Sequence, residues 1–437
     1  MVDTLLSLAG SAVESAKAAG AAEAWASTSR SRQVEFSVRD GILEKVSEAT
    51  SQSLSLQVWV DGRYSSTSST DLRPEELARL AREAVELTRA LQPDPHRQLP
   101  DPALFAGRAT VDLDLVDPTV QALTREQREA LCREQNEALA GQDKVISATS
   151  GSTDGHSASA MVSSNGFQGS QESTWLWIGS EVTLQDAVGR PEGWMWAGGP
   201  HRAMVPSPAE VAAEAMKRAR DRLGSQKGPT TRGLMVVEPS AAGRLLQSLL
   251  AAANAGQVQQ GRSFWGSRLG KKAVSGKLTV TDEPLLPRGL ASRLYDGEGI
   301  AAKAMPLIEG GVFKNLYVDT YYGRKLGMAP TTGGPSNRVV KPGKRDLAAI
   351  MSDLGEGVLV TSWLGGNADS TTGDFSLGMR GHHVTKGRAG PPIGEMNVTG
   401  NLVDLFSRLV EVGNDPWLYS ALRAPTLVFE GVDFSGV

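Results

Sequence analysis

The first 225 residues alternate between helical and strand-like spacing of hydrophobic positions. Apolar residues recur every three or four positions from Leu5 to Ala16 and predict an amphipathic helix that Gly20 ends. Apolar and polar residues then alternate through Gln33–Val38 and Ile42–Val46, which predicts two strands. The intervening Asp40-Gly41 pair is typical of a type I′ hairpin turn. These segments predict an antiparallel meander with a serine- and threonine-rich solvent face.

Further elements complete this half of the chain. A helix is expected from about Asp71, with Pro74 in its first turn, and another from Asp117-Pro118 to about Ala140. Asn165-Gly166 predicts a second hairpin, and Trp175–Ile178 is an apolar strand with little alternation. Ser207-Pro-Ala-Glu210 is a capping box that opens a helix to about Leu223.

The segment Gly224–Thr231 is typical of a linker, so we place a domain boundary between residues 225 and 226. A helix is expected at Ala241–Ala253 and another at about Asn401–Val410. The other predicted elements of this half are short strands, among them Leu278–Thr281, Met305–Glu309, Val358–Trp363 and Thr426–Glu430. We therefore predict an α+β protein with two domains: residues 1–225 form a mixed antiparallel α/β domain, and residues 226–437 form a β-rich domain.

Composition limits the possible partners and compartments. The 437 residues carry a net charge of −4, which gives no electrostatic case for binding nucleic acid. Cys132 is the only cysteine, so no internal disulfide can form and a reducing cytoplasm is expected. The N-terminal segment lacks the basic start of a signal peptide, and no apolar stretch is long enough to span a membrane.

Common catalytic motifs are absent. No phosphate-binding loop and no Gly-x-Ser-x-Gly nucleophile elbow occurs. The neighbours His382 and His383 would point to opposite faces of a strand, so they cannot readily chelate one ion. One of them could line a pocket, or both could be structural. Asp282-Glu283 and Asp296-Gly-Glu298 could form a general acid–base pair, although solvated loop acids are the simpler interpretation; His156 is expected in a turn.

Several longer motifs resemble those of the TldD/PmbA peptidase family. The resemblance is nearly continuous from Leu234 onward and looser before it. The residues that carry it are Gly261-Arg-Ser-Phe264, Thr281–Leu290, Asp296–Gly299, Leu307–Lys314, Thr372-Gly-Asp-Phe-Ser376, Glu395–Leu402 and Ala424-Pro-Thr-Leu427. The family has a metal-bearing version with a His-Glu-x-x-x-His motif, and a sister version, called TldE or PmbA, without it.

This chain resembles the sister version. Counting back from Ser263, the segment that corresponds to the metal motif is Leu246–Ala251, and none of its residues can bind zinc or accept a proton from water. The loop that supplies a cysteine ligand in the catalytic version corresponds to Val412–Leu422, which has no cysteine. The resemblance thus implies no metal and no catalytic residue in this chain, with zinc in a TldD-like partner.

The resemblance also implies a function. Subunits of this type pair with their catalytic sisters as heterodimers that enclose a proteolytic chamber for unfolded or extended peptides, such as leader peptides and labile antitoxins. We expect such a heterodimer in the cytoplasm, with a homodimer possible for the chain alone, and no nucleic acid or membrane partner. The residues expected to shape the chamber and bind substrate are Arg262, Ser263, Phe264, Gly373, Asp374, Phe375, Ser376, Gly400 and Asn401.

Two alternatives stay open. The chain could be a stand-alone hydrolase that uses His382 or His383, or a homodimeric peptide-binding protein without activity. Two departures from the family pattern leave the substrate preference open: Gly381-His-His-Val-Thr replaces an aromatic or aliphatic strand, and the basic, proline-rich Thr385–Pro392 replaces a Glu-Asn-Gly hairpin.

Overall fold

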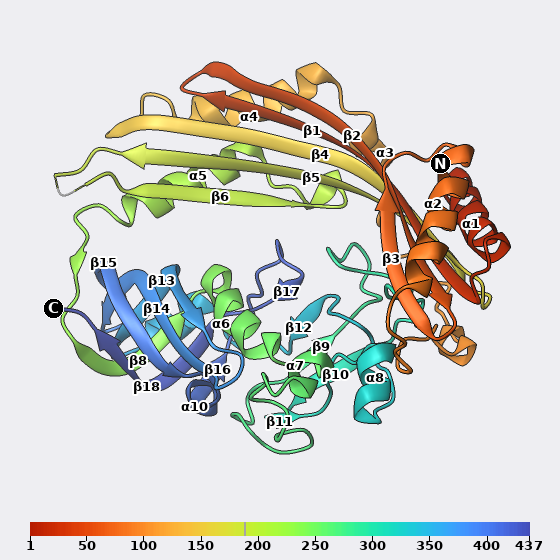
Figure 1. The fold of residues 1–437 in the computed structure, drawn as a ribbon. Helices are drawn as coiled ribbons and strands as arrows, with labels where there is room; N and C mark the ends of the chain where they lie inside the picture. The colour runs from red at the N-terminus through yellow and green to blue at the C-terminus, as the bar shows by residue number, and fades with distance from the viewer. Residues whose placement is uncertain (188) are drawn as a thin grey trace.

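A computed structural model describes residues 1–187 and 189–437 and shows a long, curved sheet that arches over the C-terminal half (Figure 1). Neighbouring strands of this sheet are antiparallel throughout. In sheet order the strands are β3 (Arg63–Ser69), β2 (Ile42–Val60), β1 (Glu23–Arg39), β4 (Val145–Ser163), β5 (Gln168–Leu184) and β6 (Glu192–Gly199).

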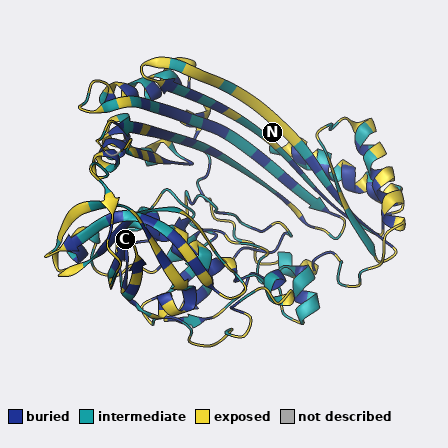
Figure 2. Ribbon diagram, turned by 60° about the vertical axis from the view of Figure 1, so that its left-hand side comes forward, coloured by how far each residue is buried: buried dark blue, intermediate teal, exposed yellow. Residues whose placement is uncertain are grey.

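One face of the arched sheet is covered by helices. Alternate residues of β1, such as Ala24, Ala26 and Val34, are buried on this face, while the residues between them point to the opposite side. Figure 2 shows the resulting alternation of burial along the strands. The covering helices are α1 (Val2–Ala18), α2 (Pro74–Arg89), α4 (Arg125–Leu139) and α5 (Pro208–Arg220). We call the opposite face, which lies toward the C-terminal half, the inner face.

Local signals in this half are mostly confirmed. Asp40 and Gly41 have φ of 48° and 81°, as a type I′ turn between β1 and β2 requires. The capping box at Ser207 and Glu210 is present at the start of α5. The single helix expected between Asp117 and Ala140 is wrong, because two helices occupy this segment: α3 (Pro118–Gln121) and α4. Thr124 caps α4 with its own capping box, which separates the two.

The C-terminal half is built around a barrel, so the predicted α+β class with a β-rich C-terminal region is confirmed. Its seven-stranded sheet has the order β16 (Leu409–Val412), β18 (Leu427–Ser435), β8 (Thr231–Val237), β13 (Glu356–Ala368), β14 (Asp374–Thr385), β15 (Arg388–Asn401) and β7 (Gln226–Lys227). A further pairing of β15 with β18 closes the strands between them into a barrel.

A smaller sheet lies beside the barrel. Its order is β11 (Val312–Phe313), β10 (Met305–Glu309), β9 (Val280–Asp282), β12 (Arg338–Val340) and β17 (Leu422–Arg423). The helices of this half are α6 (Pro239–Ala251), α7 (Ala255–Gln259), α8 (Thr320–Leu326), α9 (Leu347–Ser352) and α10 (Leu402–Ser407), and the 3-10 helices of the chain are Pro102–Phe105 and Arg202–Met204. The helix expected to reach Val410 ends at Ser407, because strand β16 begins at Leu409.

The two halves of the chain contact each other directly. Trp417 and Tyr419, in the loop before β17, pack against the core formed by α4, α5 and the arched sheet. Tyr295 of the C-terminal half packs edge-on against Phe167, in the turn between β4 and β5, with ring centroids 5.1 Å apart. Within the described residues, no helix combines the length and the apolar character that crossing a membrane needs.

Candidate functional site

A cleft of about 520 Å³ lies between the inner face of the arched sheet and the loop of residues 289–297. Strands β4 and β5 form one wall, and the loop forms the other. The inner-face residues that line the cleft are Ser159, Met161, Gln171, Ser173, Trp175 and Trp177. The cleft therefore combines aromatic rings with small polar side chains, a lining typical of ligand sites.

The tryptophans lie flat on the sheet because the neighbouring strand carries glycine. A Cβ atom placed on Gly155 would lie 2.1 Å from the ring of Trp175, so only glycine leaves room for this ring. The same relation holds between Gly179 and Trp196 at 2.1 Å. Trp196 is 41% exposed, and its ring therefore adds an open aromatic surface to the inner face.

The loop that forms the second wall is held by Asp296. One carboxylate oxygen accepts hydrogen bonds from the amides of Glu298 and Ile300 at 2.9 and 3.0 Å. The other accepts from the Thr332 hydroxyl and the Gly333 amide at 3.1 and 2.9 Å. Asp296 is 4% exposed, so the interpretation as a solvated loop acid is wrong. Its two oxygens are occupied by donors from its own loop and from the segment of Thr332 and Gly333, so this carboxylate acts structurally.

Asp282, at the end of β9, is buried in the same way. It is 1% exposed and accepts hydrogen bonds from the Tyr317 hydroxyl at 2.7 Å and from the Ser336 amide at 2.8 Å. Burial and the charge of Asp282 raise the pKa of Tyr317. This carboxylate orders the C-terminal half and is not a solvated loop acid either.

The predicted substrate-binding residues meet at one corner of the C-terminal half, which we call the signature corner (residues 262–264, 373–376, 400 and 401). The Phe264 amide donates to the Ser370 carbonyl at 3.0 Å, which joins the first segment to the turn before Gly373. Gly373 has φ of +87°, and a Cβ there would lie 3.1 Å from the amide of Asn401. Sequence segments more than a hundred residues apart therefore form one compact unit.

The signature corner has a buried part and an exposed part. Phe264 and Phe375 are 4% and 5% exposed and belong to the core, and the Ser263 hydroxyl donates to the Ala252 carbonyl at 2.6 Å. Asn401 donates to Asp374 at 3.0 Å and accepts from the Val403 amide, which caps α10. The side chains or backbone that remain exposed at this corner belong to Arg262, Asp374, Ser376 and Gly400.

Helix α6 occupies the place where the family resemblance puts the metal motif. Leu246 is fully buried in the C-terminal core, and Gln247 and Ala251 are exposed. A leucine, a glutamine and an alanine offer zinc none of the imidazole, thiolate or carboxylate ligands that it prefers. The residues present at α6 therefore do not fit a zinc ion, and no cluster of three or more His, Cys, Asp or Glu suited to a metal occurs among the described residues.

The five histidines do not assemble a site. His382 lines a cavity beside α5, and its Nδ1 lies 3.1 Å from the Gly390 carbonyl oxygen. The Nε2 atom of His383 is buried and has no hydrogen-bond partner among the described residues. His156 lies within β4, opposite Arg32 of β1, so the turn expected at this residue is wrong.

Comparisons with known proteins place the whole chain in one family. Three family models match consecutive segments: PmbA/TldA metallopeptidase domain 1 at residues 27–88, the central domain at residues 118–223, and the C-terminal domain at residues 230–436. The class of protein is thus a PmbA/TldD-type metallopeptidase fold, and this chain belongs to the PmbA/TldD family.

Individual relatives agree with this assignment. Metalloprotease PmbA of Escherichia coli O157:H7 is 28% identical over 411 residues, which cover 93% of this chain and 91% of the relative. A Bacteroides thetaiotaomicron protein that carries the name modulator of DNA gyrase is 35% identical, with a TM-score of 0.95 over 99% of this chain and 98% of that chain. The structure of TldE from Thermococcus kodakarensis shares the fold, with a TM-score of 0.86 at 18% identity, covering 98% of this chain and 100% of that chain.

The cleft on the inner face is the feature that the sequence-based prediction missed. The sequence pattern predicts only an apolar strand for Trp175 and Trp177. An alternating pattern could have placed them on the inner face. Leu176 and Ile178 are buried on the helix-covered face, and the tryptophans alternate with them. The contribution of the loop of residues 289–297 could not be found, because it is brought there by the arrangement of the two halves.

Proposed function

We propose that this chain is the non-catalytic subunit of a heterodimeric zinc metallopeptidase that cleaves unfolded or extended peptides. The observation that carries the proposal is the packing of α6. Where the family resemblance puts the first zinc ligand, Leu246 is 0% exposed and belongs to the hydrophobic core. The helix is thus built as a core element, and a TldD-like partner is expected to supply the zinc and the catalytic residues.

The inner face supports a role in holding peptide. A peptide is a chain of amide dipoles with intermittent apolar side chains, and the cleft offers both kinds of partner. Ser159, Gln171 and Ser173 can donate or accept hydrogen bonds, and the flat rings of Trp175 and Trp177 can pack on apolar side chains. In this proposal the arched sheet forms part of the chamber wall.

The signature corner is the second proposed contact with substrate. Its buried and half-buried residues fix the geometry, and the exposed ones are free to meet a peptide or the partner subunit. Ser263, Phe264, Gly373, Phe375 and Asn401 belong to the first group, and Arg262, Asp374, Ser376 and Gly400 to the second. We also expect the pair of subunits to act in the cytoplasm. The division of this chain into a domain of residues 1–225 and a domain of residues 226–437 stays a prediction.

A reconstitution experiment tests the proposal. This chain and a family member that carries His-Glu-x-x-x-His are purified separately, mixed, and assayed on an unstructured peptide. We expect a complex on size-exclusion chromatography and cleavage that neither protein shows alone. Cleavage by this chain alone, with one zinc ion per chain in elemental analysis, would support the stand-alone hydrolase. Peptide binding by a homodimer that never forms a complex would support the inactive binding protein.

A further inference from the structure

Two arginines lie where the halves of the chain meet, and neither forms an ion pair with a residue that the structure describes. Arg222 follows α5 in the N-terminal half, and Arg380 belongs to β14 of the C-terminal barrel. Both residues line two adjoining cavities, of about 210 and 300 Å³. The larger cavity lies between α5 and the barrel strands, and His382 also lines it.

The hydrogen bonds of these arginines leave donors unused. Arg222 donates from its terminal nitrogens to the Glu192 carbonyl oxygen at 2.5 Å and to the Ser362 hydroxyl at 3.2 Å. Arg380 donates from Nε to the Gly394 carbonyl oxygen at 3.2 Å. Among the described residues, the two terminal nitrogens of Arg380 form no hydrogen bond, and Nε makes the single one of this side chain. A guanidinium group carries five N–H donors, so this half-buried arginine has capacity for a ligand.

The charges of Glu238 and Glu192 act on Arg222, but neither acid comes close enough to form an ion pair with it. None of the described aspartates or glutamates forms an ion pair with Arg222 or Arg380. The acids that line the larger cavity are bound to other cations, Glu214 and Glu238 to Arg218, and Asp221 to Lys217. Burial, followed by the positive charge of Arg380, lowers the pKa of Arg222. Two neighbouring, partly buried guanidinium groups without ion-pair partners repel each other, and an anion bound between them would offset this repulsion.

We propose that the larger cavity binds a small oxyanion, such as inorganic phosphate or the terminal carboxylate of a peptide, between Arg222 and Arg380. Arginine recognises such groups because its planar donors match two oxygen atoms of a carboxylate or phosphate. One arginine belongs to each half of the chain. A bound anion therefore links the halves and stabilises their relative position, in addition to any role in peptide cleavage.

Binding of inorganic phosphate to the purified chain tests the site directly. Isothermal titration calorimetry is carried out on the wild type and on the variants Arg380→Gln and Arg222→Gln. We expect each variant to bind phosphate about tenfold or more weakly, as the loss of a charge-assisted hydrogen bond implies. Arg82→Gln is the matched control, because Arg82 is exposed on α2 and lines neither of the two cavities. Circular dichroism verifies that each variant is folded, and Arg380→Lys keeps the charge without the planar donors.

Two peptides distinguish the sources of the oxyanion. They share one sequence, and one has a free terminal carboxylate while the other is amidated. Displacement of phosphate by the free acid alone assigns the site to peptide termini, and displacement by neither peptide assigns it to free phosphate. The proposal is overturned if neither phosphate nor the free-acid peptide binds, or if all variants bind as the wild type does. Cleavage activity is not part of this readout, so the result stands apart from the proposed subunit function.

Discussion

Replacing Leu246 by histidine tests whether α6 is a core element. This substitution restores the first residue of the metal motif in a place that lies inside the hydrophobic core. Leu246 is 0% exposed, and α6 packs on β13 and α10. Losing a buried leucine costs about 1.5–3 kcal/mol. Burying a polar ring without partners costs a further 1–3 kcal/mol or so. We therefore expect Leu246→His to lower the free energy of unfolding by about 3–5 kcal/mol.

Urea unfolding followed by far-ultraviolet circular dichroism measures this change. Gln247→His is the matched control, because Gln247 lies next in the same helix and is exposed. We expect this control to change the free energy of unfolding by less than about 0.5 kcal/mol. Equal stabilities for the two variants would refute the reasoning, since they would mean that this face of α6 is not packed in the core.

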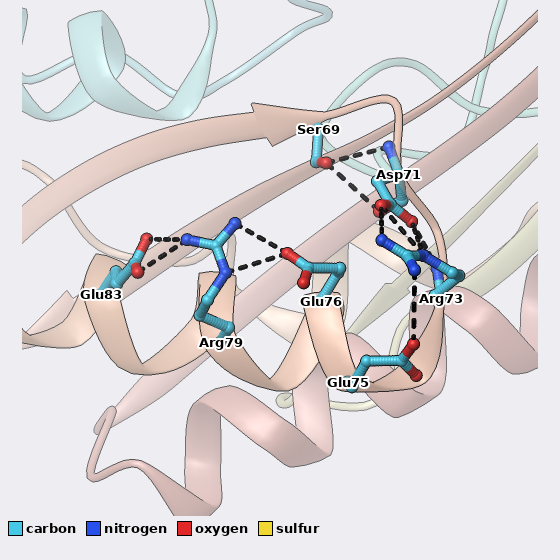
Figure 3. Close-up of polar contacts among 7 residues, drawn as sticks. All are labelled: Ser69, Asp71, Arg73, Glu75, Glu76, Arg79 and Glu83. Carbon is cyan, nitrogen blue, oxygen red and sulfur yellow. Dashed lines mark hydrogen bonds and ion pairs between the residues drawn. The ribbon is translucent and has the colours of Figure 1, made fainter.

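Three further predictions concern a buried ion pair, an exposed carboxylate and the cleft. Arg128→Met leaves Asp154, which is 1% exposed, without its partner at 2.5 Å, and should lower the free energy of unfolding by about 3–5 kcal/mol in urea, whereas an unchanged midpoint would contradict the pairing. The pKa of Asp71 is lowered to about 2, chiefly by the hydrogen bond from Arg73 (Figure 3). This pair therefore stabilises the fold at pH values above the ordinary pKa of 3.8, and the stabilisation is lost as the pH falls through 2. An NMR titration should give that midpoint, and Arg73→Gln should move it toward 3.8. In the reconstituted complex, Trp175→Ala should raise KM about fivefold or more with little change in kcat, and an unchanged KM would exclude the ring from peptide binding.

Much of the local structure could be predicted because its causes are local. Asp40-Gly41 and Asn165-Gly166 mark hairpins because these residues adopt the backbone conformations that tight turns need. The capping box at Ser207 depends on atoms three residues apart. The apolar face of α1 is visible as a repeat of three or four positions.

The extent of the arched sheet could not be predicted. Strand β1 spans Glu23–Arg39, whereas the alternating pattern marked only Gln33–Val38. The segment of residues 27–32 alternates serine with other polar or small residues and shows no apolar period. It is a strand because pairing with β2 and β4 satisfies its backbone groups along its length. Such pairing depends on segments far apart in the sequence.

The same distinction applies to the functional sites. The motifs of the signature corner and the absence of zinc ligands from Leu246–Ala251 were evident from sequence alone. That Arg222 and Arg380 line one cavity was not evident from sequence, because the segment after α5 and a strand of the barrel meet only in the folded chain. The burial of Asp282 and Asp296 was missed for a similar reason, since their hydrogen-bond partners are contributed by distant loops.

The central claim is that this chain serves a peptidase whose catalytic residues lie in the partner subunit. The most direct test is the rate of peptide cleavage by the reconstituted heterodimer when each subunit is altered in turn at the matching position of its helix. We predict that Glu→Gln in the partner's His-Glu-x-x-x-His motif abolishes cleavage. Gln247→Ala in this chain should leave the rate unchanged, because Gln247 is exposed and the residues around it do not fit a metal. Cleavage that survives the partner's substitution and is lost with Gln247→Ala would contradict the account.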